Sequence, residues 1–152
     1  MSELRMEREV AAPAEAVWAV MTDLDSSPDT LSGVDAIERL DGGGELRVGT
    51  RWRETRTLMG RQATEEMEVT ALEPGRSYTV EADSSGAHYR SVLAVEPLGT
   101  DRSRLSMTFG GEPSGMAGKL AAATVGRLFQ GATRKALERD LADIAQAAER
   151  RS

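Results

Sequence analysis

The sequence predicts an α+β domain in which a curved antiparallel sheet of about seven strands packs against one long C-terminal helix. Apolar and polar residues alternate through residues 3–11 and through most of 51–109, which is the period of half-buried strands. Between residues 114 and 150 the apolar residues recur at spacings of three and four, as on an amphipathic helix. No linker or internal repeat divides the 152 residues, so we expect a single domain over 1–152.

The first strand is followed by two short helices. Pro13 suits the first turn of a helix, where its missing N–H costs nothing. Residues 26–29, with the sequence SSPD, predict a turn and a second short helix. A further strand begins near Val34 and ends at the three glycines 42–44, and five strands joined by compact turns come after them.

Cross-strand pairing predicts the register of the first hairpin after the glycines. If residues 51–59 and 62–72 pair across a turn at Gly60 and Arg61, Arg56 lies opposite Glu65. Opposite charges at facing positions favour this register.

The next two hairpins follow from their turn residues. The turn around residues 73–76 places Val69 opposite Val80 and Ala71 opposite Tyr78. The turn at residues 85–86 places Val80 opposite Ser91. These registers collect the apolar side chains on one face of the sheet and leave the other face polar, as in sheets covered on one side.

Composition excludes several classes of function. A formal net charge of −6 gives no overall attraction to nucleic acid or anionic lipid. The absence of cysteine excludes disulfides, thiolate metal ligands and cysteine nucleophiles. No apolar run approaches the roughly 18 residues of a membrane span, and the N-terminus lacks the apolar core of a signal peptide. We therefore expect a cytoplasmic protein without stable membrane insertion, nucleic-acid partner, metal or cofactor.

Four local motifs carry a resemblance to a known superfamily. They are VAAPAEAVW at residues 10–18, LRVGTRW at 46–52, VTALEPGR at 69–76 and PLGTDRSRL at 97–105. Together with the order of elements, they resemble the helix-grip (SRPBCC) superfamily of START lipid-transfer domains, birch pollen allergens and the polyketide cyclase/dehydrase group. The resemblance covers nearly the whole chain and implies a cavity between the concave face of the sheet and the long helix.

The resemblance leaves function open, because this superfamily includes carriers, cyclases, allergens and stress proteins. One segment departs from the pattern. Relatives often carry aromatic residues after the first helix, whereas residues 26–31 read SSPDTL. No ligand contact is therefore carried over to that segment.

Polar residues on the predicted covered face are the candidate site. Arg56 paired with Glu65 would bind a ligand carboxylate, phosphate or enolate oxygen, or else form a solvated pair at the rim. Glu54 would then be an unpaired carboxylate, which is either a weak candidate for a general base or a solvated group at the cavity mouth. The tyrosines would offer hydroxyl groups to a ligand or pack as cavity walls. The predicted ligand-contacting residues are Trp52, Glu54, Arg56, Glu65, Met67, Tyr78, Tyr89, Ser91, Met107, Phe109 and Leu120.

Two other features are weaker evidence for a functional site. His88 is the single histidine and stands beside a turn, without the partners of a metal or catalytic site. Small residues crowd the first half of the long helix, which leaves room for a ligand, permits close approach to the sheet or suits a partner helix.

Three functions remain in competition. The first is binding or transport of a small hydrophobic or amphipathic molecule, which needs only a cavity and one or two polar anchors. The second is an enzyme similar to polyketide cyclases and dehydrases, in which a carboxylate or tyrosine moves a proton. The third is a non-catalytic scaffold that forms a homodimer, with its groove filled by side chains.

Overall fold

A seven-stranded antiparallel sheet with a long helix across one face makes up the computed structural model. It describes residues 2–58, 60–84, 87–113 and 115–151, with the side chains of 2, 84 and 113–130 left out of the description. In chain order, the elements are β1 (Ser2–Val10), α1 (Ala14–Met21), the 3-10 helix η1 (Leu24–Ser26), α2 (Ser27–Thr30), β2 (Val34–Arg39), β3 (Arg51–Leu58), β4 (Arg61–Glu73), β5 (Ser77–Ser84), β6 (Ala87–Pro97), β7 (Ser103–Pro113) and α3 (Gly115–Arg151).

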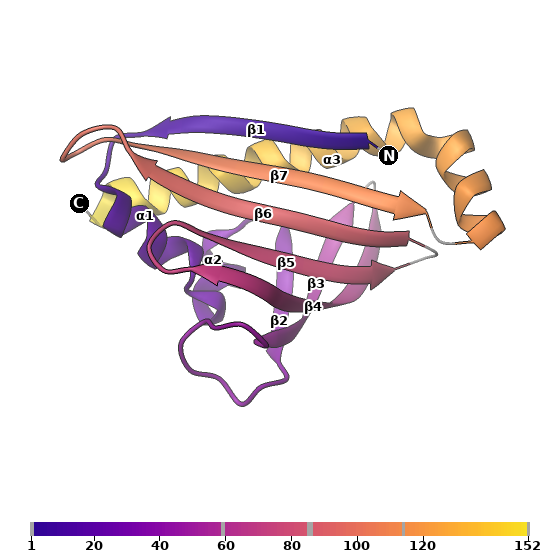
Figure 1. Cartoon of the computed structure of the whole chain (residues 1–152), viewed down its shortest axis with the longest axis horizontal. Coiled ribbons are helices and arrows are strands. Elements are labelled where there is room, and N and C mark those ends of the chain that lie inside the picture. The colour runs from indigo at the N-terminus through magenta and orange to yellow at the C-terminus, as the bar shows by residue number, and fades with distance from the viewer. Residues whose placement is uncertain (1, 59, 85–86, 114, 152) are drawn as a thin grey trace.

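The sheet has the strand order β1-β7-β6-β5-β4-β3-β2, so the first strand pairs with the last and every other pair is consecutive in the chain. Figure 1 shows the strands twisting from β1 and β7 to β2, with α3 lying behind the sheet and α1 and α2 near the C-terminal end of α3. This arrangement confirms the predicted α+β class, the helix-grip architecture and the two short helices after the first strand.

The core lies where α1 and the second half of α3 meet the sheet. Val17 on α1, Leu105 on β7 and Leu141 on α3 are almost completely buried, as is Val69 on β4. Alternate strand residues point to the same face, and helix residues three and four apart share a face, so the two periodicities of the sequence bring these side chains together.

The hairpin between β3 and β4 differs from the predicted register. Arg56 lies opposite Ala63, and Glu65 lies opposite Glu54, because Leu58 already pairs with Arg61. The turn comes one residue earlier than predicted, with Gly60 at φ +75°, in the left-handed region that glycine adopts without strain. The pairing therefore moves by two residues, which keeps each side chain on its predicted face while changing its neighbours.

The next two hairpins follow the prediction more closely. Val69 faces Val80, and Val80 faces Ser91, as predicted. The prediction of Ala71 opposite Tyr78 is wrong, because a β-bulge between Val69 and Ala71 places Ala71 opposite Thr79. A bulge inserts one unpaired residue, and no residue type in this strand predicts its position.

Two carboxylates of α3 tie the helix to the loops around it. Asp143 Oδ2 accepts hydrogen bonds from Ser32 N at 2.9 Å and from Ser32 Oγ at 2.8 Å. Glu149 Oε2 accepts one from Ala11 N at 3.0 Å. These bonds satisfy loop donors at the end of α3 where α1 and α2 pack. Among the described helices, none has the length and apolar character needed to cross a bilayer.

Buried and exposed valines give a matched test of this core. Val69 is fully buried in β4, whereas Val48 is 59% exposed. We expect Val69→Ala to lower the free energy of unfolding by about 2 kcal/mol, because it removes apolar contact and leaves a small cavity. Val48→Ala should change it by less than about 0.5 kcal/mol. Urea unfolding measures both, and equal losses would contradict the assigned core.

Candidate functional site

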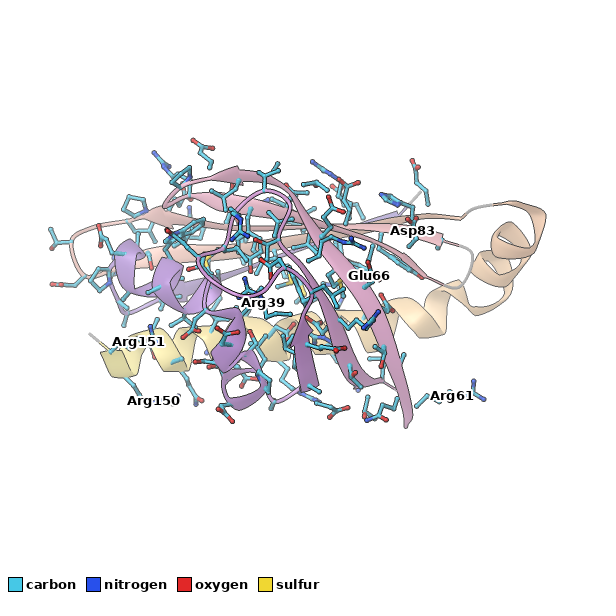
Figure 2. All side chains as sticks on the ribbon, turned by 90° about the horizontal axis from the view of Figure 1, so that it is seen from below. Arg39, Arg61, Glu66, Asp83, Arg150 and Arg151 are labelled. Carbon is cyan, nitrogen blue, oxygen red and sulfur yellow. The ribbon has the colours of Figure 1, made fainter. Side chains whose placement is uncertain are left out.

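A cavity of about 670 Å³ lies between the concave face of the sheet and α3. Figure 2 shows side chains from both layers extending into the space between them. Each predicted ligand-contacting residue whose side chain is described lines this cavity, while Leu120 lies outside the described side chains. The lining residues from that prediction are Trp52, Glu54, Arg56, Glu65, Met67, Tyr78, Tyr89, Ser91, Met107 and Phe109.

Arg56 joins the two layers through a buried ion cluster. Its Nη1 and Nη2 donate to the two carboxylate oxygens of Asp140 at 3.2 and 2.9 Å, and its Nε donates to Glu54 Oε2 at 2.6 Å. The side chains of Asp140 and Glu54 are only 5% and 12% exposed, and that of Arg56 is 28% exposed. We call Glu54, Arg56 and Asp140 the ion cluster.

The predicted cross-strand pairing of Arg56 with Glu65 is wrong, because Arg56 lies opposite Ala63. Glu54 and Arg56 are two residues apart on β3, so both side chains leave the same face of the strand. The corrected register moves Glu65 opposite Glu54, and α3 supplies the second carboxylate for Arg56.

Glu54 is not the unpaired carboxylate that the sequence suggested. Trp52 Nε1 donates to Glu54 Oε1 at 3.2 Å, while Arg56 occupies Oε2. Both oxygens are thus oriented by neighbours on the same strand. Trp52 is 3% exposed, so its ring also forms part of the cavity wall.

The loop before β2 covers the ion cluster from outside. A Cβ atom at Gly33 would lie 3.3 Å from Arg56 Nη1, which is closer than most side chains approach, and 3.7 Å from Asp140 Oδ1, which is an ordinary contact. The hydrogen bonds from Ser32 to Asp143 fasten this loop to α3. The absent side chain at Gly33 therefore lets the backbone pass close to the guanidinium of Arg56.

One guanidinium serves two carboxylates in this cluster. Burial raises the pKa of Asp140, Arg56 opposes that shift, and the negative charges of Glu54 and Asp143 add to it. Burial alone would lower the pKa of Arg56, but the charges of Asp140 and Glu54 outweigh burial and raise it. Arg56 remains a cation, and the cluster carries one more acidic group than basic groups.

Asp140 is a site residue that the sequence analysis missed. It follows Leu137 by three residues and precedes Ile144 by four, so it lies on the apolar stripe of α3. All three line the cavity. An acidic residue in the middle of an apolar stripe is the signal that would have identified it, because such residues are rarely buried without a partner.

Tyr78 forms a cavity wall and also fastens α1 to the sheet. Its hydroxyl donates to Met21 O at 2.8 Å, and its ring meets Trp18 edge to face with centroids 6.2 Å apart. Burial raises the pKa of Tyr78, and the negative charges of Glu54 and Asp140 raise it further. The hydroxyl is already bonded, so this tyrosine is a poor proton donor for a ligand.

Tyr89 and Phe109 form the aromatic pair in the cavity lining. Their rings stack with centroids 5.5 Å apart and an interplanar angle of 15°. Tyr89 faces Gly111 across β6 and β7, and a Cβ atom there would lie 2.9 Å from Tyr89 Cδ1. Gly111 thus provides the space that the Tyr89 ring occupies. Burial, with a smaller effect of Glu65, raises the pKa of Tyr89.

Thr133 is a second residue that the sequence analysis missed. It lines the cavity from α3, seven residues before Asp140, which places it about two helical turns away. Within the described part of the chain, its buried Oγ1 has no hydrogen-bond partner. A buried hydroxyl without a partner is costly.

His88 lies on the outer face of the sheet, away from the cavity. Its Nδ1 and Nε2 contact Asp83 Oδ1 and Glu81 Oε1, each at 2.7 Å, and the hydrogen bonds to Glu81 and Asp83 raise its pKa. Figure 2 shows Asp83 on the side of the sheet opposite α3. Among the described residues, no group of three or more His, Asp and Glu side chains is placed to hold a metal ion.

The ion cluster predicts a large loss of stability when its cation is removed and a smaller loss when its buried acid is neutralised. Arg56→Met leaves two buried carboxylates without a cation and should cost about 3–5 kcal/mol of unfolding free energy. Asp140→Asn leaves the neutral pair of Arg56 and Glu54 and should cost less than about 2 kcal/mol. Urea unfolding at pH 7 measures both, and a larger loss for Asp140→Asn would contradict the proposed charge balance.

The pH dependence of the stability distinguishes the same two variants. Without Arg56, the already raised pKa of Asp140 rises further, so the folded state binds a proton that the unfolded state has lost. Stability linked to a raised carboxyl pKa is gained as the pH falls. The deficit of Arg56→Met relative to wild type should therefore shrink at about pH 5, whereas that of Asp140→Asn should not.

Solved structures share this fold over almost the whole chain. The Zhui aromatase/cyclase from a Streptomyces species superposes with a TM-score of 0.82 at 23% identity, covering 99% of this chain and 94% of that chain. A protein from Thermus thermophilus gives a TM-score of 0.81 at 20% identity, covering 99% of both chains. A point mutant of norcoclaurine synthase from Thalictrum flavum, in complex with a transition-state analogue, gives 0.73 at 20% identity, covering 99% and 96%. These TM-scores, over nearly the whole of each chain, show a common fold.

Sequence comparison identifies the family. No curated protein sequence matches the chain. The family model described as polyketide cyclase/dehydrase and lipid transport matches residues 1–149, which is nearly the full length and agrees with the motifs noted in the sequence. The chain therefore belongs to the polyketide cyclase/dehydrase and lipid transport family.

Proposed function

We propose that the protein binds a small, mostly apolar molecule in the cavity, with the polar end of that molecule at the ion cluster. The observation that carries this proposal is the cavity itself, about 670 Å³ of open space beside buried charges. Ligand sites usually enclose about 300–1,000 Å³ and combine apolar walls with a few placed polar groups. The lining of this cavity has that composition.

The energetics of the empty space support a ligand. An unfilled cavity of this size forfeits packing contacts, which lowers stability. A bound apolar molecule would restore those contacts. The scaffold hypothesis instead needs a groove filled by side chains, so the open space favours a ligand-binding role over it.

Binding of a neutral probe tests this proposal. We expect the fluorescent dye N-phenyl-1-naphthylamine to bind with one saturable site per chain. Ala136 lines the cavity from α3, so Ala136→Phe should fill part of it and weaken binding at least tenfold, about 1.4 kcal/mol.

Ala142 provides the matched control for that experiment. It lies on the same helix with a similar partial exposure, and it is not among the cavity-lining residues. Ala142→Phe should leave the dissociation constant within about twofold, which is under 0.5 kcal/mol. Absence of saturable binding to the folded wild type, or equal effects of the two variants, would refute the proposal.

A second function, cyclisation and dehydration of a flexible poly-β-ketone, is favoured by one further observation. Asp140 is a buried carboxyl in a largely apolar cavity, and burial raises its pKa toward the range useful for proton transfer. A carboxylate would remove a proton from a methylene between two carbonyls, and N–H groups of Arg56 would stabilise the enolate oxygen. The enolate carbon would then attack a second carbonyl, and the alkoxide formed would take the proton back from the carboxyl group. Removal of a second proton from the attacking carbon, with loss of the new hydroxyl as water, would leave a carbon–carbon double bond and a carboxyl group ready to return its proton.

Separating binding from turnover distinguishes the two functions. If the protein is an enzyme, a synthetic linear poly-β-ketone should yield an aromatic product, followed by its absorbance. Asp140→Asn should then reduce turnover by at least about 100-fold, the usual contribution of a general acid or base, while the dye affinity stays within a few fold. A wild type that binds the dye and forms no product above the uncatalysed rate is a carrier rather than a cyclase.

A further inference from the structure

The charge of the ion cluster indicates which polar group the cavity accepts. The described lining residues include three carboxylates, those of Glu54, Glu65 and Asp140, and two guanidinium groups, those of Arg56 and Arg61. Arg61 begins β4 and is exposed, and Figure 2 shows it projecting away from the sheet. Inside the cavity, acidic groups therefore outnumber basic ones.

Arg56 already has acidic partners on both sides. Its Nε, Nη1 and Nη2 each donate to a carboxylate oxygen, from Glu54 on β3 and from Asp140 on α3. An arriving carboxylate or phosphate would be a third anion around one cation in a partly buried site. Like charges at such distances repel each other strongly where water is excluded.

Acceptor oxygens are the groups that remain available to a ligand. A carboxylate oxygen has room for about two hydrogen bonds, and each carboxylate oxygen of Glu54 and Asp140 receives one from Trp52 or Arg56. A ligand group that donates hydrogen bonds would use this remaining capacity. A cationic donor would also balance the excess negative charge.

We propose that the cavity selects molecules whose polar end is a cation or hydrogen-bond donor, an ammonium group above all, and discriminates against carboxylates and phosphates. This inference rests on the proposed function, because it assigns the ligand class of the same cavity. It reverses the expectation from the sequence that Arg56 would bind an acidic group. The negative charges of Glu54 and Asp140 also act on the nearby Tyr78, which agrees with a negative potential inside the cavity.

Three probes with one apolar body test the selection. They are 2-(2-naphthyl)ethylamine, 2-(2-naphthyl)ethanol and 2-naphthylacetic acid, which differ only in the polar end. By calorimetry at pH 7, we expect the amine to bind at least fivefold more tightly than the alcohol, and the acid at least tenfold more weakly. These comparisons use the wild type alone and do not depend on any variant folding.

A charge-neutralising variant assigns the selection to the ion cluster. Glu54→Gln keeps the two-point pair of Arg56 with Asp140 and removes one negative charge. The affinity ratio of amine to acid should fall at least tenfold in this variant. Glu3→Gln changes the net charge equally at an exposed position of β1, so it should leave the ratio unchanged.

The outcomes separate this inference from the proposed function. If neither N-phenyl-1-naphthylamine nor any of the three probes binds, the proposed function is wrong and the inference is lost with it. If the neutral dye binds and the amine does not bind more tightly than the acid, the cavity is a binding site and the inference is wrong. An unchanged ratio in Glu54→Gln would likewise remove the ion cluster as its cause.

Discussion

The contact between Arg56 on β3 and Asp140 on α3 joins the sheet to the helix at the wall of the cavity. The backbone of α3 runs close to β1 and β7, at one edge of the sheet, whereas β3 lies near the other edge. Apolar side chains alone leave about 670 Å³ between these layers. A long guanidinium side chain that reaches across to a carboxylate links them while the space stays open. The ion cluster therefore connects the helix to the far part of the sheet beside the open cavity.

This link also explains why charges occur on a face that is otherwise apolar. Replacing a buried ion pair with apolar residues of similar volume is often neutral or stabilising, so the cluster is weak evidence for a purely structural role. Apolar replacements would also fill the space that the charges keep open. The surrounding structure orients each charged group, through Trp52 on Glu54 and through the loop at Gly33 over Arg56. Such support is typical of polar groups that position a ligand.

The sequence was sufficient for the fold because the fold follows from local periodicity. The two-residue period of the strands, the three- and four-residue spacing of α3 and the turn residues between them are all visible in the chain. Faces were predicted correctly even where registers were not, because the shift at Gly60 moves the pairing by two residues. The bulge beside Val69 left no residue-type signal, so the pairing of Ala71 was not predictable.

The sequence predicted which residues of the sheet face the cavity, but not their contacts with α3. Residues of the sheet could be assigned to the cavity face by alternation, which is why Glu54 and Arg56 were identified. Their partner Asp140 lies 84 residues from Arg56, and no local pattern aligns a helix with a given strand. Thr133, which lines the cavity from α3, was missed for the same reason.

The glycine at position 111 has a consequence for how the size and polarity of cavities in such proteins can change. A single methyl group there would meet the ring of Tyr89, which is stacked on Phe109, so the aromatic wall would have to move. The charges lie elsewhere, on β3 and α3. A substitution at this glycine of β7 would therefore change the aromatic wall of the cavity without altering the residues of the ion cluster. Two properties of a guest, its size and its polarity, can thus change independently through substitutions on different strands.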